Sequence, residues 1–268
     1  MDYRLVVMDL DGTLNNDQKQ IDPETLDALM QAQRRGVRLL LASARPLLGL
    51  FKDRDALKLS EYGGLLMAYN GGMIVDAATS AVLSATTMDM ADARDVLRLL
   101  ERLPVTPILD DGARFYVTDR NGYKVDYECR NNRMDCSEVP NLADFLSFAP
   151  CKILMSTDPT GIKAVQAQIA RALPAGLTVV QTAAFYLEVI PAYINKGVGL
   201  RAACDAIGIK PVQAIAFGDS ENDIEMLWVA GIGVAMGNAD AAVKAAADMV
   251  TLSNNENGIA AALEAVLK

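Results

Sequence analysis

The stretch that decides the fold is Leu5-Val6-Val7-Met8-Asp9-Leu10-Asp11-Gly12-Thr13, close to the start of the chain. Residues 5–8 form a short unbroken apolar run, which is typical of strands buried on both faces in parallel sheets. Gly12 ends this run, so we expect Asp9 and Asp11 at the carboxyl end of the strand. In open α/β sheets ligands bind at that end of the strands. The two acids are therefore well placed for chemistry.

Two carboxylates one residue apart either share a proton or need a cation. Their hard oxygen atoms suit Mg²⁺. A calcium loop of the EF-hand type fits poorly, because Asp-x-Asp-Gly lacks the spacing and the terminal Glu of that motif. Asp and Gly also favour ordinary solvated turns. The segment Asp9-Leu10-Asp11-Gly12 by itself is therefore consistent both with a metal site and with an ordinary turn.

The next segment completes a β-α-β unit. Asp22 is a candidate helix N-cap and Pro23 falls at the first helical position. Gly36 ends this helix, and residues 37–42 form the next expected strand. Ser43 follows that strand, so its hydroxyl is expected at the same edge of the sheet as the acids, although Ser also commonly caps a helix.

A hairpin is expected next, because the dipeptide Asn70-Gly71 separates two apolar runs, 65–68 and 73–75. Asn-Gly is the strongest short hairpin signal. Asn70 lies at a strand end, where ligand binding and turn chemistry explain it equally well.

A second acidic cluster follows the apolar run 212–217. Asp219 and Asp223 are four residues apart, with Asn222 between them, so a helix that starts near residue 220 would direct both acids to the strand end. Acids also favour helix N-termini without any function. The remaining strand-like and helix-like segments alternate as 232–236, 239–247, 249–252 and 257–267. This alternation predicts an α/β fold with a Rossmann-like, doubly wound parallel sheet.

Between these two halves the chain changes character. Short strands and helices are mixed there, which suits an α+β module with an antiparallel sheet. We therefore predict a core domain of residues 1–83 and 189–268 and an inserted α+β domain of residues 84–188.

Composition excludes several classes of function. The chain has 268 residues and a net charge of -9, which argues against nucleic acid or an anionic membrane as a partner. It has no histidine, so a Ser-His-Asp triad, a Cys-His pair and a His-ligated zinc site are excluded. Its four cysteines form no C-x-x-C pair, and neither a signal peptide nor a membrane-spanning run is evident. We expect a cytoplasmic protein.

The expected strand ends bring Asp9, Asp11, Ser43 and Asp219 to one edge of the sheet, and Lys196, which follows the insert, could join them. Carboxylates, a hydroxyl and an ammonium suit phosphoryl transfer, in which catalysis consists mainly of positioning and charge neutralisation.

At this point the chain resembles a family. Its motifs are similar to motifs one to four of the haloacid dehalogenase superfamily: Asp9-Leu10-Asp11-Gly12-Thr13, Ser43, Lys196 and Gly218-Asp219-Ser220-Glu221-Asn222-Asp223. The insert between the second and third motifs is similar to the C2 cap of the Cof-type phosphatases. The resemblance covers essentially the whole chain.

The resemblance implies a role for each motif. Asp9 would attack phosphorus and form an aspartyl-phosphate, and Asp11 would carry protons to the leaving group and from water. The implied ligands of Mg²⁺ are Asp9, Asp11 through its backbone carbonyl, and Asp219, supported by Asn222 and Asp223. Ser43 and Lys196 are implied to be catalytic as well, because they would bind the oxygens of the transferring group. The implied substrate-binding residues are Ser43, Ala44, Arg45, Asn70, Gly71 and Lys196.

One position departs from the family pattern. The second motif commonly reads Thr-Gly-Arg in this branch, whereas this chain has Ser43-Ala44-Arg45. The hydroxyl is retained, but Ala44 would resist a positive φ.

The expected function is Mg²⁺-dependent hydrolysis of a small phosphate monoester, with sugar phosphates as the leading class of substrate. A phosphomutase of the phosphomannomutase type is one alternative, and a non-catalytic phosphate-binding module, similar to receiver domains, is another. The expected partner is a small phosphorylated metabolite, without nucleic acid or membrane, and the oligomeric state stays open.

Overall fold

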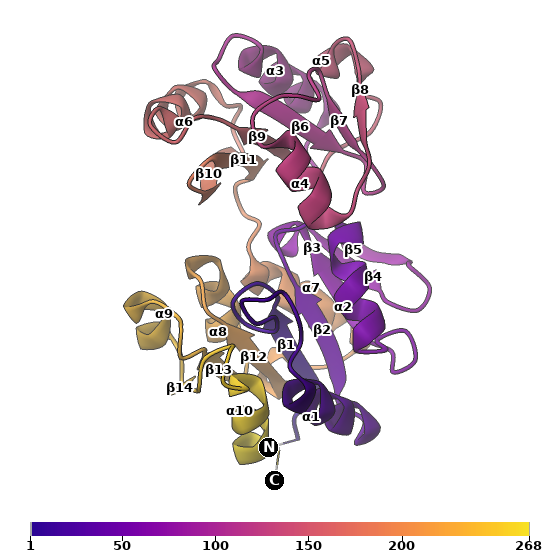
Figure 1. Ribbon diagram of the computed structural model, residues 1–268. Coiled ribbons are helices and arrows are strands. Elements are labelled where there is room, and N and C mark those ends of the chain that lie inside the picture. Colours follow the sequence, from indigo (N-terminus) through magenta and orange to yellow (C-terminus); the bar gives the residue numbers. More distant parts are fainter. Residues whose placement is uncertain (1, 268) are drawn as a thin grey trace. The chain divides into compact units, whose positions relative to one another are not determined.

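The computed structural model describes residues 2–267, which divide into two compact units (Figure 1). The core unit comprises Met1–Ala44, Leu50–Ala85 and Asn195–Lys268, and the insert unit comprises Arg45–Gly49 and Thr86–Ile194. The divisions at 85/86 and 194/195 differ from the predicted 83/84 and 188/189. The cause is strand pairing, since strands run through both predicted boundaries: β5 (Val82–Ala85) and β11 (Tyr186–Pro191).

The core unit contains an eight-stranded sheet in the order β14-β13-β12-β1-β2-β3-β4-β5 within the described residues. All pairs from β14 to β3 are parallel, and β4 and β5 are antiparallel additions. This confirms the doubly wound parallel sheet. The strands besides β5 are β1 (Leu5–Asp9), β2 (Arg38–Ala42), β3 (Leu65–Ala68), β4 (Met73–Asp76), β12 (Ala214–Gly218), β13 (Ile232–Ala235) and β14 (Met249–Val250).

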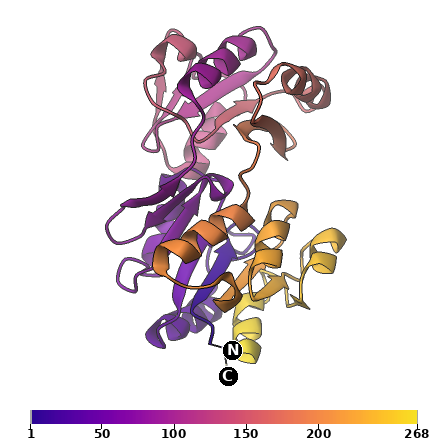
Figure 2. The ribbon, with the colours of Figure 1, turned by 180° about the vertical axis from the view of Figure 1, so that it is seen from behind.

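Strand β1 lies inside the sheet because it is apolar on both sides. Its central residue Val7 pairs with Leu40 of β2 and with Ala216 of β12. Helices cover both faces: Figure 1 shows α1 in front of the sheet, and Figure 2 shows α7 and α8 on the opposite face. The core helices are α1 (Pro23–Arg34), α2 (Phe51–Ala56), α7 (Lys196–Ile207), α8 (Ile224–Val229), α9 (Ala241–Ala246) and α10 (Gly258–Val266).

Helix α1 begins at Pro23, as expected, but its predicted cap has another role. The Asp22 carboxylate accepts a hydrogen bond from Asn16 Nδ2 at 2.7 Å, and among the described residues it receives none from the first turn of the helix. Asp22 therefore closes the loop that precedes the helix. Local spacing predicted where the helix starts but not which donor the side chain binds.

The insert unit is an α+β module, as predicted. Its six-stranded sheet has the order β10-β11-β9-β6-β7-β8 within the described residues, and only the pair β7 and β8 is parallel. Helices α3 and α6 pack on one face, whereas α4 packs on the other. The elements besides β11 are β6 (Thr106–Asp110), β7 (Phe115–Val117), β8 (Cys136–Glu138), β9 (Ile153–Ser156), β10 (Leu177–Ala183), α3 (Met90–Leu100), α4 (Val125–Asn132), α5 (Leu142–Phe145) and α6 (Ile162–Ala172). Across residues 2–267, no helix is both long enough and apolar enough to cross a bilayer.

The turn between β3 and β4 fixes the start of α7. This turn is a short 3-10 segment, Tyr69–Gly71, and Gly71 has a φ of +100°. A Cβ at Gly71 would lie 2.2 Å from the Asn195 carbonyl oxygen, and a Cβ at Gly199 would lie 2.7 Å from Gly71 Cα. Two glycines thus let the backbones meet directly, and this contact holds the first turn of α7, which carries Lys196.

We expect Gly71→Ala to lower the free energy of unfolding by roughly 2–5 kcal/mol, because it combines left-handed strain with a clash against backbone. Urea unfolding measures the change. Gly36→Ala is the matched control, since Gly36 has a φ of +87° but open space around its missing Cβ. That variant is expected to lose only about 1–2 kcal/mol. Equal losses in the two variants would show that the contact with α7 contributes nothing.

Candidate active site

The site forms where three neighbouring strands of the core sheet end. Asp9 is the last residue of β1, Ser43 follows β2, and Asp219 follows β12. The sheet order places β1 between the other two strands. Parallel direction brings their carboxyl ends to one edge, as the sequence predicted.

Lys196 is the buried cation of the site. Its side chain is 0% exposed, and Nζ donates to Asp9 Oδ1 at 2.5 Å and to Asp223 Oδ1 at 2.6 Å. The first turn of α7 positions it, and Asn195 caps that turn by accepting from the Val198 N–H at 2.8 Å. The Lys196 ammonium thus binds two carboxylates, Asp9 and Asp223, which lie 187 and 27 positions away from it in the sequence.

Asp223 organises the loop after β12. Its Oδ2 accepts hydrogen bonds from the backbone N–H groups of Asp219 and Ser220, each at 3.0 Å. Gly218 makes this possible, because a Cβ there would lie 2.4 Å from Asp223 Cβ. Both carboxylate oxygens of Asp223 are therefore engaged, one by Lys196 and one by backbone. The predicted helix starts later than expected, since residues Glu221–Asp223 form a 3-10 turn before α8.

Asp219 joins this loop to the loop after β1. Its Oδ1 accepts from Thr13 Oγ1 at 2.6 Å, and its Oδ2 accepts from Ser220 Oγ at 3.3 Å. Gly12 has a φ of +88°, and a Cβ there would lie 2.4 Å from Asp219 Oδ2. The carbonyl of Gly12 also accepts from Asn238 Nδ2 at 2.8 Å. The Asp219 carboxylate of the fourth motif therefore leaves no room for a side chain at Gly12 of the first motif.

Among the described residues, the three carboxylates of this cluster contact one ammonium, that of Lys196. Oxygen atoms of Asp9, Asp219 and Asp223 all lie within 4.8 Å of one another. Burial raises the pKa of Asp9 to about 7, and Lys196 opposes this rise while Asp223 adds to it. Burial also raises the pKa of Asp219. Although burial alone would lower the pKa of Lys196, Asp223 and Asp9 raise it above its usual value. The site therefore has excess negative charge and oxygen donors, which suits a divalent cation.

Asp11 lies at the outer side of the site. Its side chain is 38% exposed, and Oδ1 accepts from Lys19 Nζ at 2.6 Å. The side chain of Asp9, by contrast, is only 12% exposed. The two acids of the first motif thus have different surroundings, one buried against Lys196 and one accessible beside Lys19.

Ser43 and Asn70 are neighbours through their backbones. The Ser43 N–H donates to the Met67 carbonyl at 2.9 Å, and the Ser43 carbonyl accepts from the Asn70 N–H at 2.8 Å. Asn222 Nδ2 donates to Asn70 Oδ1 at 3.0 Å, which links the loop after β12 to the turn after β3. Four loops therefore meet in one hydrogen-bonded group.

The other predicted substrate contacts have mixed surroundings. Ala44 keeps a φ outside the left-handed region, so its methyl group introduces no backbone strain. Gly71 packs against α7, which accounts for its lack of a side chain. Arg45 groups with the insert unit and donates to the Asn131 carbonyl at 3.1 Å within that unit. Substrate binding by these three residues stays a prediction.

Thr13, Lys19 and Asn238 were not assigned from the sequence. Thr13 lies in the first motif and offers a hydroxyl, so the motif itself could have indicated it. Lys19 and Asn238 contact the site from loops whose path only the fold determines.

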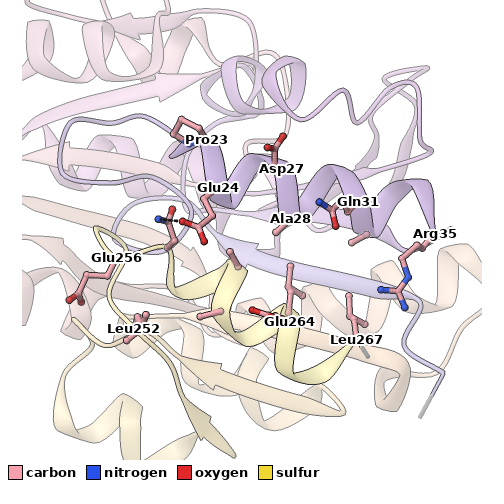
Figure 3. Close-up of a pocket in the computed structure, with 15 residues that line it drawn as sticks. Pro23, Glu24, Asp27, Ala28, Gln31, Arg35, Leu252, Glu256, Glu264 and Leu267 are labelled. Carbon is pink, nitrogen blue, oxygen red and sulfur yellow. Dashed lines mark hydrogen bonds between the residues drawn. The ribbon is translucent and has the colours of Figure 1, made fainter.

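The core unit also has a groove away from this site. It has a volume of about 900 Å³ and runs between α1 and α10 (Figure 3). Glu24 crosses it and accepts from Asn257 Nδ2 at 3.0 Å. Its lining residues include none of the residues predicted for the active site. The carboxylates and the lysine at the strand ends, and not the size of a cavity, therefore identify the site.

Comparisons with known proteins agree with this geometry. The family pattern of the haloacid dehalogenase-like hydrolases matches residues 6–263. A Bacillus subtilis (strain 168) protein named "Putative phosphatase YxeH" is 31% identical over 269 residues, with 97% of each chain covered. The 5-amino-6-(5-phospho-D-ribitylamino)uracil phosphatase YcsE of the same organism is 28% identical, with 98% of this chain and 95% of that protein covered.

Solved structures give the same result. The crystal structure of a haloacid dehalogenase-like hydrolase from Bacteroides thetaiotaomicron has a TM-score of 0.93 and 31% identity to this chain, and the match covers 98% of this chain and 99% of that one. The family match spans both halves of the core unit and the insert. The chain is therefore an enzyme of the haloacid dehalogenase-like hydrolase family, and this confirms the resemblance drawn from its motifs.

Proposed function

We propose that the protein hydrolyses a small phosphate monoester, with Mg²⁺ as its cofactor and an aspartyl-phosphate as its intermediate. The observation that carries this proposal is the position of Lys196, whose fully buried ammonium bridges Asp9 and Asp223. Such a group holds a carboxylate nucleophile in one orientation and offers positive charge to a phosphoryl group.

The carboxylate group fits the metal. Asp9, Asp219 and the backbone carbonyl of Asp11 are the proposed ligands. Asp223 supports them, because its two oxygens are already engaged by Lys196 and backbone N–H groups. When bound, a divalent cation would neutralise charge on the carboxylates and on the transferring phosphoryl group.

In the proposed reaction the residues of the site have separate roles. Asp9 attacks phosphorus, the bond from phosphorus to the leaving oxygen breaks, and Asp11 gives that oxygen a proton. In the second step Asp11 takes a proton from water and the water oxygen bonds to phosphorus. The bond between phosphorus and the Asp9 oxygen breaks, which frees the Asp9 carboxylate and inorganic phosphate. Ser43 and Lys196 bind phosphoryl oxygens throughout. The exposed position of Asp11 suits a group that must reach a leaving group and then water.

We propose a phosphorylated sugar or polyol as the substrate. The name of YcsE places its phosphate on a ribityl chain, which supports this class. We also propose that the protein works in the cytoplasm, because its four cysteines are free thiols.

Asp9→Asn is expected to lower kcat by at least about 10³-fold, because removal of one member of a catalytic unit removes most of its effect. Phosphate release from a panel of monoesters, with Mg²⁺ or with EDTA, measures the change. EDTA should abolish turnover by the wild type. Activity that survives in Asp9→Asn would contradict the aspartyl-phosphate mechanism, and a strict need for a bisphosphate activator would favour a phosphomutase instead.

Stability should depend on pH through Asp9. Its pKa is about 7 in the folded protein against 3.8 as the ordinary value, so between these values the folded state binds more protons than the unfolded state. The free energy of unfolding of the metal-free protein should therefore fall, through this group, as the pH rises across that range. Denaturant titrations of the wild type and Asp9→Asn isolate the effect, because the difference between them should change with pH in this window.

Mg²⁺ should restore the stability that the metal-free protein loses as the pH rises. The metal binds ionised carboxylates, so we expect it to raise the Tm of the wild type more at pH 8 than at pH 5. Thermal unfolding with Mg²⁺ or EDTA at both values tests this expectation without any substrate. The same rise in Asp9→Asn would show that Asp9 is not a ligand.

A further inference from the structure

We propose that Lys19 is a positioning residue for Asp11, which holds the side chain of that residue where its protonated carboxyl group can give a proton to the leaving-group oxygen. The inference rests on the proposed function, since Asp11 has this task only in a phosphatase. It assigns a role to a residue that no motif of the chain contains.

The first observation is the contact itself. Lys19 Nζ lies 2.6 Å from Asp11 Oδ1, although the two side chains are 61% and 38% exposed. Exposed ion pairs usually add little to folding stability, since each long side chain loses freedom in forming them. The pair therefore adds little to folding stability, and its direct effect is to fix the position of the Asp11 carboxyl group.

The second observation is the backbone of Lys19. Its φ is +58°, a left-handed conformation that a lysine adopts only when its surroundings enforce it. Its N–H donates to the Asn16 carbonyl at 2.9 Å, and its own carbonyl accepts from the Lys52 ammonium. Both polar backbone groups are thus held, and the ammonium projects from a fixed point.

The third observation is the loop that surrounds Lys19. Asn16 Oδ1 accepts from the N–H groups of Gln18 and Gln20 at 3.0 and 3.1 Å, and the Asn16 N–H donates to the Gln20 carbonyl at 2.9 Å. Outside the turn, the Asp17 N–H donates to Asn255 Oδ1 at 3.1 Å. The loop is therefore closed on itself and tied to a distant segment, so Lys19 reaches Asp11 from a rigid support.

The chemistry gives this arrangement a measurable signature. Proton transfer to the leaving oxygen matters for an alkyl phosphate, whose alkoxide is a poor leaving group, and matters little for p-nitrophenyl phosphate. A residue that acts through Asp11 should therefore affect the two substrates differently. A residue needed only for folding should affect both alike.

The experiment compares Lys19→Met with the wild type on p-nitrophenyl phosphate and on the best alkyl monoester of the panel. We expect kcat to fall about tenfold or more on the alkyl ester and less than about threefold on p-nitrophenyl phosphate, within the range of general acid catalysis. Lys19→Arg should retain most of the alkyl activity. Lys58→Met is the matched control, because Lys58 also has a left-handed φ, +52°, and an exposed ion pair, 3.8 Å from Glu61. It should change neither rate.

A second arm uses Asp11→Asn. In that background Lys19→Met should lower the alkyl rate no further, since the group through which it acts is gone. Equal loss on both substrates, no loss on either, or a full additional loss in the Asp11→Asn background would each overturn the role of Lys19. These results assume a wild type that releases phosphate and an inactive Asp9→Asn. If both conditions hold and the Lys19 variants behave otherwise than expected, only the role of Lys19 fails. If either condition does not hold, the proposed function itself fails, so the two failures are distinguishable.

Discussion

The structure of the core unit depends on one buried ammonium. Lys196 lies between Asp9 and Asp223, and removal of its ammonium would leave two buried carboxylates without a compensating charge. Asp9 belongs to the first strand, Asp223 to the loop after β12, and Lys196 to the helix that follows the insert. The ion pair therefore joins three segments that the chain reaches at its beginning, after its insert and near its end.

Close backbone contacts make this arrangement possible. Gly12 leaves room for the Asp219 carboxylate, Gly218 for Asp223, and Gly71 for the start of the helix that carries Lys196. At each position a side chain would meet the group that the site needs. Because two of these glycines also have positive φ, the backbone path and the position of a charged group are determined together.

Sequence patterns predicted the parallel strands of the core sheet and their common edge, for identifiable reasons. The parallel strands are continuous apolar runs, so β1, β2 and β12 could be located, and their common direction implied one catalytic edge. Local signals were weaker where a side chain had a choice of partner. Asp22 marks the start of α1 but binds Asn16, and Asn222 binds Asn70, a partner 152 positions away. The boundaries of the insert unit differ from the predicted ones because β5 and β11 run through the predicted positions.

The sequence by itself determined that this chain forms a doubly wound sheet with an inserted α+β module, and that Asp9, Asp11, Ser43, Lys196 and Asp219 could meet at one edge. Periodicity and motif spacing carry that information because they reflect burial along each element. The tertiary structure decided which charges pair: Lys196 with Asp9 and Asp223, and Lys19 with Asp11. Those pairings depend on loops whose paths are set by contacts between distant segments, and no local pattern of residues records them.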